Sequence, residues 1–258
     1  YRRSPEHVFP VPLEDCLSAV KYFIANAESF GVDPHRIAIS GDSAGGNLAM
    51  AVALNLSTDS RITHPLKSQI LIYPALQAFD FQLPSYQTFH DESGPFIIST
   101  HGLVRAFLWY GAGKTLFFNS FLTNNHTTSA LKRSKYSNFV SEKNVPKKFF
   151  NENYIETKSD YGDEETCNEV SDWILNPLFA PLMATNESLS KLPPTFILLA
   201  EYDVLRDDGY ILAKRLKNLN QKVQLSYWEG LQHGFLLFGL EASEKAMNEI
   251  IKYVHKNV

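Results

Sequence analysis

Short apolar runs alternate with longer helical patterns along much of the chain. The runs that predict buried strands lie at 37–40, 69–73, 195–200 and 223–228. Apolar residues at helical spacing predict a first helix through Leu13, Leu17, Val20 and Ile24. The same spacing predicts a closing helix through Ala246, Ile250, Ile251 and Val254. Two further helices are predicted over 47–56 and 210–219. This alternation predicts an α/β fold with a mostly parallel sheet flanked by helices on both faces.

The alternating pattern breaks down between about 78 and 175. Aromatic residues gather in the first part of this segment, and its second part holds a polar stretch over 141–169. This segment is too long for a simple connecting loop. We therefore expect a cap or lid over the sheet, helical in its first half and poorly ordered in its second. The aromatic residues fit the core of the cap and the lining of an apolar pocket equally well. We expect one catalytic domain over 1–258, with this insertion at about 78–175.

Composition and charge exclude several functions. The chain has 258 residues, 44% of them hydrophobic, and a formal net charge of −4, with no basic cluster of the kind that binds nucleic acid. Its two cysteines cannot form a disulfide framework, and neither has the spacing of a zinc site. No apolar run is long enough to span a bilayer. We therefore expect a globular protein without nucleic-acid partners or a metal.

The sequence Gly41-Asp42-Ser43-Ala44-Gly45 fits the G-x-S-x-G pattern. It lies between a predicted strand and a predicted helix, the setting in which small neighbours permit a strained turn that exposes a nucleophilic serine. The alternative is that Ser43 only caps the helix. A cap does not require glycines on both sides, so the pattern favours a nucleophile.

A nucleophilic serine needs a base to take its proton and an acid to orient that base. In chain order Asp203 follows the predicted strand over 195–200, and His233 follows the strand over 223–228. Both places are strand ends, where ligand crevices form in parallel sheets. Asp203 could instead be only a turn residue, and Asp207 and Asp208 suit N-capping of the next helix.

The remaining histidines offer weaker candidates for the base. They fall at turns, in the insertion or on the closing helix, where solvated histidine is the usual interpretation: His7, His35, His64, His90, His101, His126 and His255. None of them follows a late strand, so His233 is the predicted base.

Several segments carry a more specific resemblance. They are YR at 1–2, PEH at 5–7, FP at 9–10, GDSAGGNLA at 41–49, LIYPALQ at 71–77, LPP at 192–194, EYDVLRDDG at 201–209 and HGF at 233–235. In this order they resemble the hormone-sensitive-lipase branch of the α/β-hydrolases, and within it LIYPALQ and the run over 203–209 resemble the arylacetamide deacetylase-like proteins. The resemblance implies an α/β-hydrolase fold in which Ser43 is the nucleophile, Asp203 the orienting acid and His233 the general base, with no metal or organic cofactor.

The resemblance also implies an H-G-G-G segment on a loop upstream of the stretch that matches 1–10. That loop supplies backbone N–H donors to the oxyanion, which leaves the Ala44 N–H as the donor within this chain. We therefore expect the early strands of the sheet to precede Tyr1 as well, and the chain by itself to be inactive or nearly so.

The cellular location of the protein is implied only by the resemblance. Relatives are anchored by an N-terminal membrane helix with the catalytic domain in the lumen of the endoplasmic reticulum, so we expect membrane association through a segment before Tyr1. The N-glycosylation pattern occurs at Asn125 and Asn186 in loop-like sequence, and at Asn55 near the end of a predicted helix. Asn125 and Asn186 are the better candidates.

These observations predict a serine carboxylesterase or lipase-like hydrolase that cleaves small apolar acyl esters or arylamides through an acyl-enzyme. The alternatives are a non-catalytic ligand-binding relative, or a fragment left inactive by the missing oxyanion loop.

Overall fold

The core of the molecule is a four-stranded, fully parallel sheet. The computed structural model describes residues 1–59, 61–62, 64–91 and 97–258. The strand order is β1-β2-β3-β4, with β1 at Ala38–Asp42, β2 at Ser68–Ile72, β3 at Thr195–Tyr202 and β4 at Val223–Gln232. The predicted parallel sheet is confirmed. β3 and β4 extend past the predicted strands at their carboxyl ends, toward Asp203 and His233.

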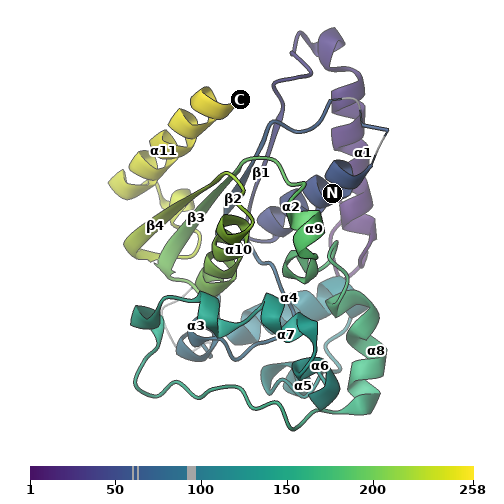
Figure 1. The fold of residues 1–258 in the computed structure, drawn as a ribbon, viewed down its shortest axis with the longest axis vertical. Helices are drawn as coiled ribbons and strands as arrows, with labels where there is room; N and C mark the ends of the chain where they lie inside the picture. Colours follow the sequence, from purple (N-terminus) through teal and green to yellow (C-terminus); the bar gives the residue numbers. More distant parts are fainter. Residues whose placement is uncertain (60, 63, 92–96) are drawn as a thin grey trace.

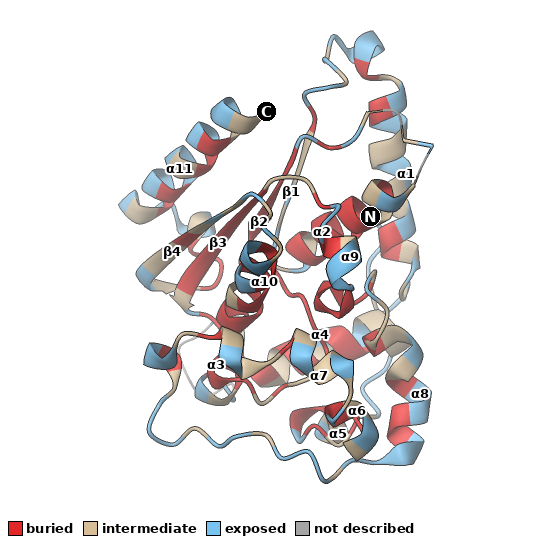
Figure 2. Cartoon of the chain, viewed as in Figure 1, coloured by how far each residue is buried: buried red, intermediate tan, exposed pale blue. Residues whose placement is uncertain are grey.

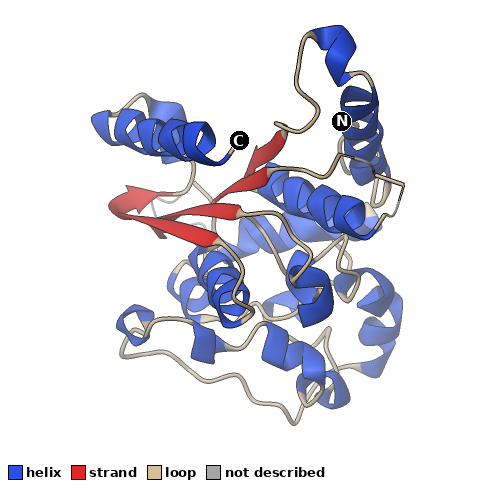
Figure 3. Cartoon of the chain, turned by 45° about the horizontal axis from the view of Figure 1, so that its top comes forward, coloured by secondary structure: helices blue, strands red, loops and turns tan. Residues whose placement is uncertain are grey.

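Long helices cover both faces of this sheet (Figures 1 and 3). They are α2 at Ala44–Thr58, α10 at Arg206–Asn218 and α11 at Glu241–Asn257, while α1 at Val11–Ala25 packs against α2. α11 lies on one side, where its Ile250 packs with Ile70 and Leu198, whereas Leu71 and Ile197 face the α2 and α10 side. Alternate residues of one strand are thus buried against different helices, which explains the continuous apolar runs (Figure 2).

The segment between β2 and β3 is mostly short helices, of which α3 to α8 lie together at one end of the sheet while α9 lies beside α2 (Figure 1). They are α3 at Pro84–Thr88, α4 at Thr100–Ala112, α5 at Phe118–Leu122, α6 at Ser129–Lys132, α7 at Lys135–Phe139, α8 at Glu164–Ile174 and α9 at Asn186–Leu189. Single 3-10 turns occur at Ala27–Phe30, Glu142–Asn144, Lys147–Phe149, Pro181–Met183 and Phe235–Phe238.

The second half of this segment is more ordered than we expected from its polar sequence. The Asp163 side chain caps α8 by accepting a hydrogen bond from the Thr166 N–H, and one helical face buries Cys167, Val170 and Ile174. Spacings of three and four residues put these three side chains on the same face. The expectation of a poorly ordered second half is therefore wrong for α8, while 150–163 forms no regular helix or strand.

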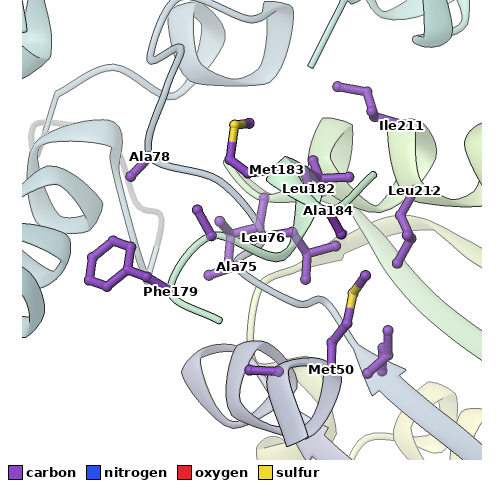
Figure 4. Packing of buried hydrophobic residues seen from close by; sticks show 14 of the residues in the cluster. Met50, Ala75, Leu76, Ala78, Phe179, Leu182, Met183, Ala184, Ile211 and Leu212 are labelled. Atoms are coloured by element: carbon purple, nitrogen blue, oxygen red, sulfur yellow. The ribbon is translucent and has the colours of Figure 1, made fainter. Parts of the chain in front are cut away.

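The apolar core continues from the sheet into the helical segment. Leu76 follows β2 and packs among three side chains from different segments (Figure 4). These are Met50 of α2, Leu212 of α10 and Leu182 of the 3-10 turn at Pro181–Met183. The predicted aromatic residues divide between two roles. Phe79 and Phe81 are buried in this core, whereas the residues on α4 also line a cavity described below: Phe107, Trp109 and Tyr110.

His126 is buried in the helical segment, so the expectation that it is solvated is wrong. Its Nε2 lies 3.0 Å from the Ala78 carbonyl oxygen and its Nδ1 lies 3.3 Å from that of Ser120. The imidazole stacks on Phe121 with ring centroids 3.9 Å apart. Burial lowers the pKa of His126 to about 4.

This burial predicts acid sensitivity. Because the folded-state pKa lies below the unfolded value of about 6.5, the neutral ring stabilises the folded protein above pH 6.5, and that stability is lost as the pH falls toward 4. Between pH 7 and pH 5 the loss should be about 2 kcal/mol. His126→Gln should remove this part of the pH dependence. Urea unfolding of both proteins at the two pH values tests it, and equal losses in both proteins would contradict it.

Candidate active site

Ser43 lies at a sharp turn between the end of β1 and the start of α2. Its φ of 55° and ψ of −119° are rarely adopted by residues other than glycine. The turn is held by hydrogen bonds from the Ser43 N–H to the Ile72 carbonyl, 2.9 Å, and from the Ala75 N–H to the Ser43 carbonyl, 3.3 Å. The Ser43 side chain makes no capping hydrogen bond to α2, so the helix-cap alternative is wrong.

Two glycines make this turn possible, and one of them lies outside the G-x-S-x-G pattern. A Cβ on Gly41 would lie 2.1 Å from the Gly45 carbonyl oxygen, and a Cβ on Gly46 would lie 2.8 Å from the Pro74 Cβ. A Cβ on Gly45 would meet nothing nearer than the Asp42 carboxylate at 3.8 Å. The close approach of β1 and α2 therefore depends on Gly41 and Gly46, whereas the pattern had pointed to Gly45.

The three predicted side chains lie in one hydrogen-bonded line. His233 Nε2 lies 2.9 Å from Ser43 Oγ, and His233 Nδ1 lies 2.9 Å from Asp203 Oδ2. The Leu205 N–H donates to Asp203 Oδ1 at 2.8 Å, so Asp203 both shapes a turn and faces the imidazole. Asp203 and His233 are buried and Ser43 is partly exposed. This arrangement holds the ring with Nδ1–H toward the carboxylate and leaves Nε2 to accept the serine proton.

All three residues lie where parallel strands end. Ser43 follows β1, Asp203 follows β3 and His233 follows β4. The register of β3 and β4 shifts between Ala200 and Tyr202, and the His233 N–H then donates to the Tyr202 carbonyl. This irregularity sets the backbone of His233 beside the end of β3, which brings the acid and the imidazole together.

Tyr73 is a neighbour of this line that was not selected from the sequence. Its ring lies 4.6 Å from the His233 ring, and its φ of 33° marks a second strained position directly after β2. Burial raises the pKa of Tyr73, and the nearby carboxylates of Asp42 and Asp203 add to the rise. The neutral phenol thus forms one wall beside the imidazole. Only its place after a buried strand could have signalled this position.

Asp207 and Asp208 do not cap α10, contrary to our expectation. Both are fully buried, and no side chain caps this helix. Asp207 accepts from the Ser85 N–H, and Asp208 accepts from the Leu76 N–H and the Tyr86 hydroxyl. Burial raises the pKa of Asp208 to about 8. These acids connect α10 to the helical segment.

A cavity of about 270 Å³ opens beside Ser43. Its lining is mostly apolar and includes Leu48 of α2 and, from α4, Leu103 and Phe107. Ala44 also lines it, and as the first residue of α2 its N–H has no partner within the helix. The cavity can therefore hold an apolar group while a backbone donor lies next to the serine.

The predicted glycosylation sites differ in exposure. Asn186 is exposed at the start of α9. Asn125 is half-buried, and Thr127 of its pattern is fully buried. Over the described ranges, no cluster of three or more His, Cys, Asp or Glu side chains could hold a metal ion. No helix in those same ranges has the length and apolar character needed to cross a membrane.

Comparison with known proteins identifies the family. Residues 1–134 and 130–237 match a family described as having the alpha/beta hydrolase fold. The chain is 38% identical to arylacetamide deacetylase of Bos taurus over 262 residues and 35% identical to neutral cholesterol ester hydrolase 1 of Bos taurus over 271 residues, covering 100% of this chain in both cases. It spans 64% of the length of each of these relatives.

A solved structure agrees at the level of the fold. Carboxyl esterase 2 of Tuber melanosporum superposes with a TM-score of 0.70 at 23% identity, covering 100% of this chain and 66% of that one. The chain therefore belongs to the α/β-hydrolase fold family, in its hormone-sensitive-lipase branch.

Proposed function

We propose that this protein is a serine carboxylic-ester hydrolase in which Ser43 is the nucleophile, His233 the general base and Asp203 the orienting acid. The observation that carries the proposal is the line from Asp203 through His233 to Ser43 Oγ, with 2.9 Å at each step, beside an apolar cavity. Membership of a family of esterases and lipase-like hydrolases supports the same chemistry.

The proposed reaction has two steps. His233 Nε2 takes the Ser43 proton as Oγ attacks the substrate carbonyl carbon, and the imidazolium then returns that proton to the departing alcohol or amine as the acyl bond breaks. Water next loses a proton to His233, attacks the acyl-enzyme carbonyl and releases the acid, and the proton returns to Ser43 Oγ. Asp203 stays ionised and stabilises the imidazolium in both steps.

The oxyanion of each tetrahedral intermediate would accept a hydrogen bond from the Ala44 N–H. One such donor lowers the activation free energy of acyl transfer by on the order of 3 kcal/mol. An upstream H-G-G-G segment would add further donors, and that expectation stays a prediction. The activity is therefore proposed for a protein that contains both this chain and the upstream H-G-G-G segment.

The proposed substrates are small apolar acyl esters or arylamides. The apolar lining from α2 and α4 supports an apolar substrate group next to Ser43. The names of the two relatives, a deacetylase of arylacetamides and a hydrolase of cholesterol esters, are consistent with either an amide or an ester. The helical segment over about 78–175 acts in this proposal as the cap that provides one wall of the cavity.

A fluorophosphonate probe tests the proposal on the longest natural form of the protein. The expected result is covalent labelling at Ser43, found by peptide mass spectrometry, together with hydrolysis of 4-nitrophenyl esters. A folded protein that is neither labelled nor active would refute the proposal and would favour a ligand-binding relative without catalysis.

Location in the endoplasmic reticulum lumen, with membrane association, stays a prediction. If the chain enters that compartment, Asn186 is the more accessible acceptor for a glycan, and Asn125 is the second candidate. Expression with microsomes should yield protein whose mass falls on glycosidase treatment, and Asn186→Gln should reduce that mass difference. An unchanged difference would remove Asn186 from consideration.

A further inference from the structure

Asp203 lies on a short loop between β3 and α10, and this loop is held in place by a contact from the helical segment rather than from the sheet. Asp203 uses both carboxylate oxygens, one toward His233 and one for the Leu205 N–H, so its direction depends on where the loop lies. Val204 and Leu205 are completely buried. A displacement of this short loop would therefore move the carboxylate away from the imidazole.

The contact that holds this loop comes from α3, in the helical segment. The Ser85 hydroxyl donates to the Val204 carbonyl oxygen at 2.7 Å. The Ser85 N–H donates to Asp207 Oδ2, also at 2.7 Å, on the first turn of α10, where this loop ends. Ser85 and Asp207 are both fully buried, so water cannot replace either hydrogen bond.

Neighbouring interactions make this contact rigid. Asp207 Oδ1 accepts from Arg206 Nε at 3.0 Å, and the Arg206 guanidinium lies 4.0 Å from the centre of the Phe149 ring. The Tyr86 hydroxyl donates to Asp208 Oδ1 at 2.9 Å. Asp207 is thus held by a second group, and α3 is joined to α10 by a second hydrogen bond, so the Ser85 contact belongs to a network that favours one position of the loop.

We propose that Ser85 is a positioning residue for Asp203, and that the segment between β2 and β3 holds the acid in line with His233 through the loop 203–207. The catalytic consequence rests on the proposed hydrolase function. The segment would then do more than cover the cavity, because its first helix would set the geometry of the Asp203–His233 pair.

The test, in the longest natural form of the protein, is Ser85→Ala, which removes the hydroxyl and keeps the backbone N–H. We expect kcat to fall about tenfold or more, because small displacements of catalytic groups are costly, while KM changes by less than about twofold. A displaced carboxylate stabilises the imidazolium less, so the acid limb of the kcat/KM profile should move to lower pH. Ser85→Cys, which keeps the shape but donates weakly, should give intermediate values and covers the case in which the alanine variant does not fold.

Thr100→Val is the matched control. Thr100 is also fully buried and donates to the Tyr86 carbonyl oxygen at 2.7 Å, but it makes no hydrogen bond to the loop 203–207. It should lower the melting temperature without moving the pH profile. If the Ser85 variants behave like Thr100→Val, with lost stability and an unchanged acid limb, Ser85 is only structural and the inference is overturned.

A second measurement does not depend on turnover. The proton between His233 Nδ1 and Asp203 Oδ2 should give a downfield resonance in the wild-type protein, and in Ser85→Ala this resonance should shift or broaden. An inactive wild-type protein that still shows this change would refute the proposed function and leave the positioning role supported. An active wild-type protein whose resonance and pH profile survive in the variants would refute the positioning role alone.

Discussion

In the longest natural form of the protein, Ser43→Ala should lower kcat for ester hydrolysis by about 10⁴-fold to 10⁶-fold and abolish labelling by fluorophosphonates. The variant keeps the cavity and loses only the Oγ that lies 2.9 Å from His233 Nε2. KM or substrate binding should therefore change little while turnover disappears. His233→Ala should have a similar effect, and adding it to Ser43→Ala should cost little more, because residues that act as one unit are not additive.

Ser57→Ala provides the control on the same helix. Ser57 lies near the other end of α2, where its hydroxyl donates to the Ala53 carbonyl, and its loss should leave kcat within about twofold of wild type. Single-turnover kinetics with a 4-nitrophenyl ester separates acylation from binding. If Ser43→Ala retains more than about a hundredth of wild-type kcat, another nucleophile must be present and the assignment is wrong.

The sequence was sufficient to predict the parallel sheet and the three aligned side chains. Buried parallel strands are continuous apolar runs, and each predicted site residue directly follows such a run, so local pattern and position agree. Ser43, Asp203 and His233 were selected because their residue types, chain order and strand-end placement matched one chemistry. Both the strand pattern and the strand-end positions can be read from neighbours in the sequence.

The features that the sequence did not reveal depend on contacts between distant segments. His126 is buried because Ala78 and Phe121 surround it, and no periodicity marks that position. Asp207 looked like a helix-capping residue until α3 placed the Ser85 N–H against it. Gly46 is required because Pro74, which follows the next strand, packs against it. In each case a tertiary partner overrides the local preference of the residue.

Gly41→Ala should be far more damaging than Gly45→Ala, although both glycines belong to the G-x-S-x-G pattern. The new Cβ at 41 would lie 2.1 Å from the Gly45 carbonyl oxygen and 2.3 Å from its carbon. These are backbone atoms, so no side chain can turn away, and β1 must separate from α2. We expect a loss of about 3 kcal/mol or more in stability and, because Ser43 moves with the turn, at least a 10²-fold loss in kcat/KM.

Gly45→Ala is the matched control for this prediction. Its Cβ would meet no atom closer than 3.8 Å, and alanine favours a helical conformation over glycine by up to about 1 kcal/mol, so stability should be kept or increased. Gly46→Ala should lie between the two, since its Cβ would lie 2.8 Å from the Pro74 Cβ and 3.0 Å from the Pro74 Cα, closer than the nearest atom at 45 but less close than the backbone contact at 41. Thermal unfolding and ester hydrolysis of the three variants test this order. Equal losses at 41 and 45 would show that the pattern, rather than the close approach of β1 and α2, sets the requirement for glycine.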